Sequence, residues 1–396
     1  VKEAVDAVFG HQQYIMGPEV AQLEKKLARY CQVEHAIGCA SGSDALLLSL
    51  MALDIQPGDY VITTPFTFFA TAGAIARLRA VPVFIDIDPV SYNIDPEQID
   101  SFLSGNHPLN ERFSGWEEKT KAIIPVHLYG QMADMDTIMQ LAEEYDLAVV
   151  EDAAQAIGAR YKNRPAGSVG DTGCFSFFPS KNLGGFGDGG FITTNNDELA
   201  EKLRTLRVHG AKPKYHHHMV GVNSRLDTIQ AAALMVKFNY IDEWNAKRRE
   251  VANRYRKLFE RNNMVLDAPE CFEDCEPMGT AECGNFRMPG KLLPPRETTG
   301  DPEKGGRHVY HQFVIRTAKR DLLREVLKEA NIGNNVYYPV SLHEQECFSE
   351  YGYRSEDCPH AVCASNQTLA LPVYPELTEP QQHYIVNTIN NFLSSQ

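Results

Sequence analysis

The chain has 396 residues, enough for two domains, and its 43% hydrophobic and 23% charged residues are ordinary for a globular protein. The formal net charge of −14 argues against a nucleic-acid-binding protein. No apolar run approaches the roughly 20 residues of a membrane-spanning helix, and nothing at the N-terminus resembles a secretion signal. The nine cysteines, an odd number, favour a reducing cytoplasm over a disulfide framework. We therefore expect a cytoplasmic protein that binds neither membranes nor nucleic acids.

Two clusters of possible metal ligands stand out in the sequence. Cys271, Cys275 and Cys283 lie close together in a polar segment, but their spacing matches no common zinc site. The consecutive histidines at 216–218 cannot easily converge on one ion, so we interpret them as part of a loop. No metal site is expected.

Strands and helices alternate through the first half of the chain. The apolar pattern predicts strands at 35–40, 60–63, 81–86, 121–126 and 148–151, and helices at 18–30, 44–53, 71–78 and 135–145. Strand-helix alternation with nearly continuous apolar strands is typical of a mostly parallel sheet that is covered by helices on both faces. Ligands of such sheets bind at the carboxyl ends of the strands.

Lys181 lies between two apolar segments, 174–178 and 190–194, that we expect to be strands. Five glycines follow it between 184 and 190 and leave space for a flat ligand. A buried lysine has a lowered pKa, which leaves part of its amine nucleophilic near neutral pH. The alternative at this point is a β-hairpin whose lysine extends to water.

Other polar residues follow the predicted strands. The turn Ser41-Gly42-Ser43 leads from a strand into a helix, an arrangement that binds anions, most often phosphate. Asp152 ends an apolar strand, where a carboxylate is costly unless it has a cationic partner or caps a helix. Together with Lys181, this turn and the aromatic Phe68, Asp152 points to a protonated pyridine nitrogen as its partner.

The second half of the chain is more varied. We expect one long helix at 226–261 that connects two domains, and an irregular segment at about 264–306 that forms a surface excursion or a lid. Further on we predict strands at 309–316 and 335–338 and helices at 321–330 and 379–393. We therefore divide the chain into a large sheet-containing domain, 1–245, and a small C-terminal α+β domain, 246–396.

Motifs along almost the whole chain resemble one family. Among them are Ala40-Ser-Gly-Ser-Asp-Ala-Leu, Glu151-Asp-Ala-Ala-Gln, Phe175-Ser-Phe-Phe-Pro-Ser-Lys, Gly221-Val-Asn-Ser-Arg-Leu-Asp and Tyr338-Pro-Val-Ser-Leu-His. These match the DegT/DnrJ/EryC1/StrS family of pyridoxal-phosphate-dependent nucleotide-sugar aminotransferases. The resemblance implies an α/β fold of the aspartate-aminotransferase-like type, fold type I, and pyridoxal 5′-phosphate as the cofactor.

The resemblance also implies roles for individual residues. Lys181 corresponds to the catalytic lysine that carries the cofactor and transfers a proton, and Asp152 to the catalytic aspartate that pairs with the pyridinium nitrogen. Gln155 corresponds to the residue that binds the ring hydroxyl, and Phe68 to the one that stacks on the ring. The residues expected to bind the cofactor are Gly42, Ser43, Asp44, Phe68, Asp152, Gln155, Ser176, Lys181 and Asn223.

Two further sets of contacts follow from the resemblance. The backbone at Ser43 and Asp44 and the hydroxyl of Ser176 would hold the phosphate. Asn223 corresponds to an asparagine that reaches the phosphate from the neighbouring subunit, so a homodimer with shared active sites is expected. The residues expected near the sugar are Arg225, His308 and Tyr310.

The implied reaction is transamination from L-glutamate to a nucleotide-linked ketosugar, with pyridoxamine phosphate as intermediate. Residues 13–19 and 208–227 resemble the branch that aminates C3 of UDP- or dTDP-linked 3-ketosugars for surface polysaccharides or glycosides. A C4 aminotransferase of the same family is the main alternative, since it uses the same catalytic residues. A sensor that binds the cofactor or sugar without turnover, and a carbon–carbon lyase on the same fold, are weaker alternatives.

Overall fold

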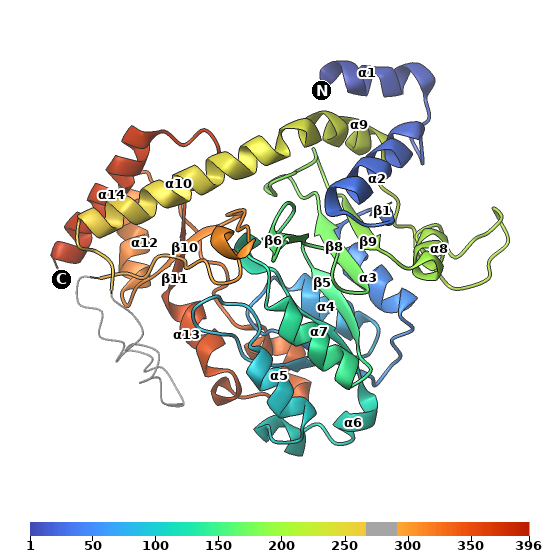
Figure 1. Cartoon of the computed structure of the whole chain (residues 1–396), viewed down its shortest axis with the longest axis horizontal. Helices are drawn as coiled ribbons and strands as arrows, with labels where there is room; N and C mark the ends of the chain where they lie inside the picture. Colours follow the sequence, from blue (N-terminus) through green and yellow to red (C-terminus); the bar gives the residue numbers. More distant parts are fainter. Residues whose placement is uncertain (267–290, 396) are drawn as a thin grey trace.

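The computed structural model describes residues 1–266 and 291–395 (Figure 1). The cluster at Cys271, Cys275 and Cys283 lies outside these residues, as does most of the predicted insertion at 264–306. No helix of the described part is long and apolar enough to cross a lipid bilayer.

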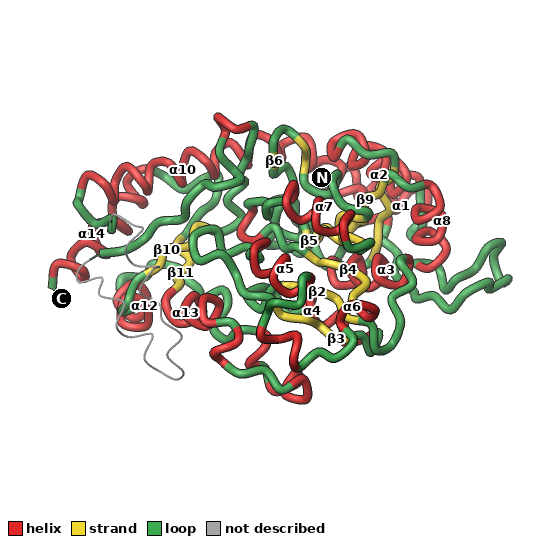
Figure 2. Tube along the Cα trace, turned by 60° about the horizontal axis from the view of Figure 1, so that its bottom comes forward, coloured by secondary structure: helices red, strands yellow, loops and turns green. Residues whose placement is uncertain are grey.

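A seven-stranded sheet forms the centre of the N-terminal part (Figure 2). In spatial order its strands are β1 (His35–Cys39), β9 (Gly190–Thr194), β8 (Thr172–Ser176), β5 (Ala148–Asp152), β4 (Thr120–Ile124), β2 (Tyr60–Thr63) and β3 (Val81–Phe84). Strand β9 pairs antiparallel with both β1 and β8, whereas the other pairs are parallel. This mostly parallel sheet confirms the predicted α/β fold class.

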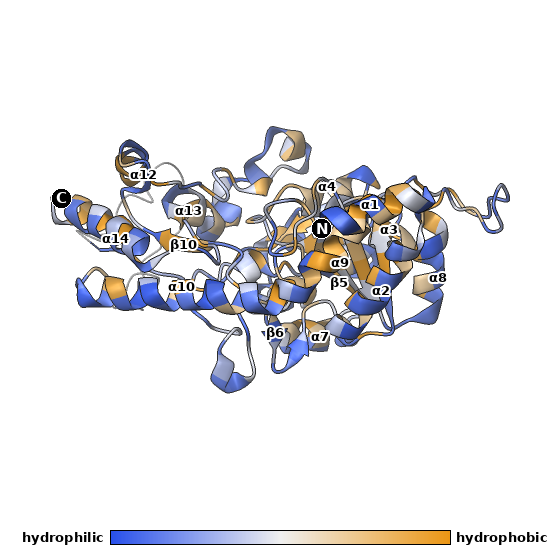
Figure 3. Cartoon of the chain, turned by 90° about the horizontal axis from the view of Figure 1, so that it is seen from above, coloured by the Kyte–Doolittle hydropathy of each residue, from blue (hydrophilic) through white to orange (hydrophobic). Residues whose placement is uncertain are grey.

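Helices pack on both faces of the sheet, and most strand residues are accordingly buried; Figure 3 shows hydrophobic colouring along strands such as β5. One face is covered by α3 (Gly42–Ala52), α4 (Ala70–Arg77) and α8 (Asp197–Leu206). The other face is covered by α2 (Pro18–Cys31), α5 (Pro96–Leu103), α7 (Met135–Glu144) and α9 (Thr228–Lys237). An N-terminal helix, α1 (Lys2–His11), packs on α9.

The C-terminal part has its own apolar core (Figure 1). That core is built from α10 (Ile241–Arg261), β10 (Phe313–Arg316), α12 (Arg320–Glu329), β11 (Thr368–Leu371) and α14 (Glu379–Ser394). Another apolar cluster contains residues of both parts, including Phe66 and Phe84 from the sheet region and Ala361 and Ala364 of α13 (Pro359–Gln367). The two parts are therefore joined by a packed interface. The division at 245/246 falls inside α10 and stays a prediction.

Two secondary-structure predictions were wrong. The predicted strand 335–338 forms only an isolated bridge, between Asn335 and Ala370 of β11, a strand that we had not predicted and that pairs along its length with β10. The single helix predicted at 226–261 is two helices, α9 and α10, separated by a 3-10 turn at Phe238–Tyr240. Helix periodicity continues through that turn, so the apolar pattern alone did not reveal it.

Helix α12 offers a direct test of the C-terminal core. Leu323 is fully buried and its neighbour Leu322 is exposed. We expect Leu323→Ala to lower the free energy of unfolding by about 2–5 kcal/mol, because it leaves a cavity. Leu322→Ala, the matched control on the same helix, should change it by less than about 0.5 kcal/mol. Urea denaturation followed by circular dichroism measures both, and equal losses would contradict the assigned helix face.

Candidate active site

Asp152 is the last residue of β5, at the carboxyl edge of the sheet, and is only 5% exposed. The Thr71 hydroxyl donates a hydrogen bond of 2.8 Å to Oδ2, and the backbone N–H of Ala154 donates one of 3.2 Å to Oδ1. Burial raises the pKa of Asp152, while these hydrogen bonds and the charge of Lys181 lower it in part. The carboxylate is thus fixed in place, and among the residues that the structure describes it forms no salt bridge.

Lys181 lies in the connection from β8 to β9, as the sequence predicted. Burial lowers the pKa of its amine to about 8, and the nearby charge of Asp152 raises it in part. The glycine loop behind it is held by α9: Gln230 accepts a hydrogen bond of 2.8 Å from the backbone N–H of Phe186, and Lys237 donates to the carbonyl of Gly184. A Cβ on Gly184 would lie 2.3 Å from the carbonyl oxygen of Pro179, so the turn requires glycine.

The predicted phosphate-binding residues come together at the N-terminus of α3. Ser41 caps the helix by accepting a hydrogen bond of 3.0 Å from Asp44 N–H. The Asp44 N–H, which we expected to bind the phosphate together with that of Ser43, is therefore already used by the cap, whereas the N–H groups of Gly42 and Ser43 begin the same helix; anion binding here stays a prediction. A Cβ on Gly42 would lie 2.8 Å from Cβ of Ser176, which places the Ser176 hydroxyl beside this turn. Two distant segments thus form one concave set of donors.

Gln155 and Phe68 lie at the same edge of the sheet. Gln155 Oε1 accepts a hydrogen bond of 2.7 Å from the backbone N–H of Tyr129, and Nε2 donates one of 3.0 Å to the Tyr338 hydroxyl. Phe68 is 57% exposed, and its ring centroid lies 6.3 Å from that of Tyr338. An exposed ring beside a buried carboxylate is suited to stack on a planar ligand.

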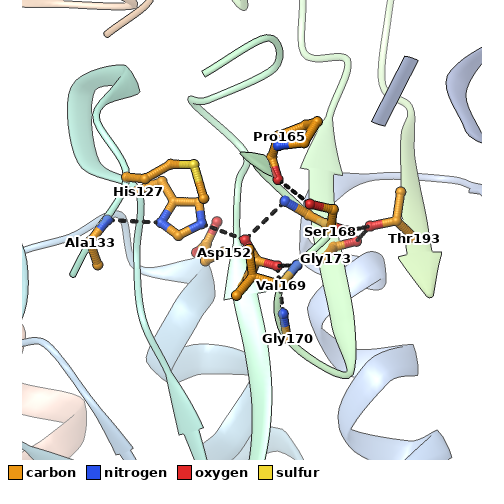
Figure 4. A network of polar contacts seen from close by, with 12 residues as sticks. His127, Ala133, Asp152, Pro165, Ser168, Val169, Gly170, Gly173 and Thr193 are labelled. Atoms are coloured by element: carbon orange, nitrogen blue, oxygen red, sulfur yellow. Dashed lines mark hydrogen bonds and ion pairs between the residues drawn. The ribbon is translucent and has the colours of Figure 1, made fainter. Parts of the chain in front are cut away.

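His127 lies close to Asp152 (Figure 4) and is fully buried, as is Glu151, the residue before Asp152 on β5. His127 Nδ1 accepts a hydrogen bond of 3.2 Å from Ala133 N–H, so the proton is on Nε2, which lies 2.8 Å from Glu151 Oε2. Glu151 also accepts hydrogen bonds from the N–H groups of Gly167, Val169 and Gly170, at 2.7–2.9 Å.

Both oxygens of the Glu151 carboxylate therefore accept hydrogen bonds. Burial alone would raise its pKa, but the hydrogen bond from His127 and the backbone donors bring that pKa below its ordinary value. Because Glu151 precedes Asp152 on β5, these contacts hold the end of β5 against the loop that leads into β8.

Asn223 and Arg225 lie together at the surface. Arg225 Nε donates a hydrogen bond of 2.6 Å to Asn223 Oδ1, which leaves the amide N–H groups of Asn223 to face outward. Both residues line a pocket of about 520 Å³ together with Ser41 and Asp188. The pocket thus adjoins the phosphate-binding turn of the same chain. The contribution of Asn223 to a neighbouring subunit stays a prediction.

His308 and Tyr310, the other predicted sugar contacts, are buried instead, at 2% and 0% exposure. Their rings stack with centroids 3.8 Å apart. The Tyr310 hydroxyl donates a hydrogen bond of 2.5 Å to Glu297, and Arg256 donates to the same hydroxyl. The structure therefore does not bring these two residues to the pocket of Asn223 and Arg225, and their substrate role stays a prediction.

Comparisons with known proteins bear on this geometry. The sequence profile described as the DegT/DnrJ/EryC1/StrS aminotransferase family matches residues 1–272 and 291–390. The chain belongs to this family. The predicted family is thereby confirmed, and with it an aminotransferase that depends on pyridoxal phosphate.

Individual relatives of this aminotransferase align over nearly their full length. It is 47% identical to a "Pleiotropic regulatory protein" of Geobacillus stearothermophilus, covering 99% of this chain and 94% of that one. It is 38% identical to the UDP-2-acetamido-2-deoxy-3-oxo-D-glucuronate aminotransferase of Pseudomonas aeruginosa, covering 99% and 96%. A crystal structure of a family aminotransferase from Brucella abortus superposes with a TM-score of 0.85 at 35% identity, covering 99% and 94%.

The residues of the site fit the cofactor. A half-buried lysine with a lowered pKa can attack an aldehyde, and a buried carboxylate can pair with a pyridinium nitrogen. The helix N-terminus at Gly42 and Ser43 supplies donors for a phosphate. The close approach of Gly42 to Ser176, which a Cβ would block, completes that set.

Sequence reasoning missed three residues that act on this site. Thr71 and His127 hold Asp152 and its strand, and Tyr338 holds Gln155. Tyr338 was noticed only as part of a family motif, and Thr71 only as the start of a helix. Their contacts join segments far apart in the chain, so periodicity and spacing carried no signal for them.

The lowered pKa of Lys181 predicts an unusual reactivity of the apo-protein. An amine-reactive reagent should modify Lys181 with a pH midpoint of about 8 rather than the ordinary lysine value of 10.5, which mass spectrometry can follow. Asp152→Asn should move that midpoint to lower pH, because the carboxylate charge stabilises the protonated amine. A midpoint near the ordinary value in both proteins would contradict the buried position of Lys181.

The hydrogen bond from Thr71 predicts a second effect. Thr71→Val keeps the shape but removes the donor to Asp152, so a smaller share of the carboxylate is charged. We expect pyridoxal phosphate to bind about tenfold more weakly, as measured by equilibrium dialysis. Thr71→Ser, which retains the hydroxyl, is the matched control and should bind nearly as the unmodified protein does. Equal affinity of all three proteins would show that Thr71 does not support Asp152.

Proposed function

We propose that this protein transfers an amino group from L-glutamate to C3 of a nucleotide-linked 3-ketosugar. The observation that carries this proposal is the pairing of Lys181, whose pKa is lowered to about 8, with the buried Asp152 at one edge of the sheet. Transamination requires of the protein an amine that is partly neutral near neutral pH and, beside it, a carboxylate held in position. The expected products are amino sugars for surface polysaccharides or glycosides.

Pyridoxal phosphate, when bound, supplies the electron sink, and pyridoxamine phosphate is its amino form. The protein's own residues do the rest. Asp152 holds a positive charge on the pyridine nitrogen, and the donors around Gly42 and Ser176 hold the phosphate. The Lys181 amine, neutral in a substantial fraction near its pKa of about 8, accepts and returns the proton at the reacting carbon.

The proposal of C3 rather than C4 is based on similarity to a relative that is named for a 3-oxo sugar. The P. aeruginosa relative, 38% identical over nearly the whole of both chains, is named for a 3-oxo sugar linked to UDP. The residues at 13–19 and 208–227 support the same branch. A C4 aminotransferase remains the alternative, since Lys181, Asp152 and Gln155 would serve either reaction.

We further propose that two copies of the chain form a homodimer with shared active sites. Asn223 and Arg225 line a pocket at the surface, beside the phosphate-binding turn. Phe186, in the loop after Lys181, is 65% exposed, which is unusual for a phenylalanine so close to a candidate active site. A second subunit would cover both features.

A sensor without turnover is the second candidate, because the G. stearothermophilus relative is named a regulatory protein. The complete set of Lys181, Asp152 and Gln155 argues against it. Binding without turnover has no need of a lysine whose pKa is lowered.

The proposal can be tested in two half-reactions. L-Glutamate should remove the visible absorption band of the protein loaded with pyridoxal phosphate, and a UDP- or dTDP-linked 3-ketosugar should restore it. Lys181→Ala should reduce turnover by about 10²–10⁴-fold or more, since it removes the proton-transferring amine. Restoration by a 4-ketosugar alone would establish the C4 reaction. A band that responds to neither glutamate nor ketosugar would favour the sensor.

A further inference from the structure

The amide of Gln155 has only one possible orientation. Its two polar atoms lie near Tyr129 N–H, at 2.7 Å, and near the Tyr338 hydroxyl, at 3.0 Å. A backbone N–H can only donate, so the amide oxygen must face Tyr129 and the amide nitrogen must face Tyr338. The phenol oxygen of Tyr338 is therefore the acceptor in that contact, and its own proton is left to donate to another atom.

Tyr338 reaches this position from the C-terminal part of the chain, 183 residues from Gln155. Its ring lies at centroid distances of 6.3 Å from Phe68 and 6.2 Å from Phe66, both in the segment that follows β2. Burial raises the pKa of the Tyr338 phenol, and the charge of Asp152 acts in the same direction. The phenol thus stays protonated, and remains a donor, throughout the neutral range.

From this arrangement we propose that Tyr338 is a positioning residue of the cofactor site: it fixes the amide of Gln155 and donates its phenolic hydrogen bond to the ring oxygen of bound pyridoxal phosphate. The proposal rests on the proposed function, which places the ring hydroxyl of the cofactor at Gln155. It assigns to the C-terminal part a direct influence on the cofactor.

This hydrogen bond has a chemical consequence. A donor at the ring oxygen withdraws electron density from it and competes with the proton on the nitrogen that joins Lys181 to the cofactor. Tyr338 should therefore lower the proton affinity of that nitrogen and help to keep it unprotonated at neutral pH. Removing the phenolic hydroxyl should raise the proton affinity.

The test is a pH titration of the visible absorption band in the protein loaded with pyridoxal phosphate. For Tyr338→Phe we expect the midpoint to rise by about half to one pH unit, the effect of one hydrogen bond. The dissociation constant of pyridoxal phosphate, measured on the apo-protein, should rise about threefold to tenfold. Tyr337→Phe is the matched control: within the described residues the Tyr337 phenol has no hydrogen bond, and its backbone carbonyl, which accepts one from Tyr129, is unchanged. This variant should match the unmodified protein in both measurements.

A double-mutant cycle separates this role from a purely structural one. If Tyr338 acts together with Gln155, Tyr338→Phe should weaken cofactor binding less in a Gln155→Ala background than in the unmodified protein. Additive losses, or a titration midpoint of Tyr338→Phe equal to that of the unmodified protein, would overturn the proposal. If Tyr338→Phe does not fold, as judged by circular dichroism, Tyr338→Met, which also removes the phenol but fills the space flexibly, replaces it, and an unchanged midpoint then overturns the proposal. An unmodified protein without any visible band would instead refute the proposed function.

Discussion

The buried carboxylate of Asp152 is the constraint on which the rest of the site depends. A charge at the end of a central, fully buried strand is costly, and the protein offsets this cost with fixed donors. Burial also lowers the pKa of Lys181. It therefore shifts the two pKa values towards each other: one electrostatic environment raises the pKa of Asp152, the proposed partner of the pyridine ring, and lowers that of Lys181, the amine proposed to move the proton.

The position of Asp152 is also stabilised by the contacts of the preceding residue, Glu151. Glu151 has a donor at every oxygen, His127 completes that set, and both are shielded from water. Since Glu151 and Asp152 are consecutive on β5, a displacement of one carboxylate would move the other. The sheet therefore holds two consecutive buried acids: Glu151 is satisfied by hydrogen bonds in the interior, and Asp152 lies at the carboxyl edge, where we propose that it contacts the cofactor.

Much of this site was predictable because polar residues that follow parallel strands come together at the carboxyl edge of the sheet, even when the conformations of the loops are unknown. Asp152, Lys181 and the turn at Gly42 were found in this way. The predicted strand at 335–338 was wrong because an apolar pattern carries no information about partners, and only Asn335 of that segment pairs, with Ala370 of β11. Tyr338 was missed as a contact of Gln155 for the same reason, since no local pattern reports a neighbour 183 residues away.

The contact between Tyr338 and Gln155 also affects the order in which the protein is made. During synthesis the N-terminal sheet emerges first and can fold while later residues are still being added. Lys181 and Asp152 have then been synthesised, but Tyr338, which contacts Gln155, has not, nor has Val309, whose carbonyl accepts a hydrogen bond from Asn182 beside Lys181. A nascent chain therefore holds an incomplete cofactor site, and its completion is a late event that accompanies docking of the C-terminal residues against Phe66 and Phe84.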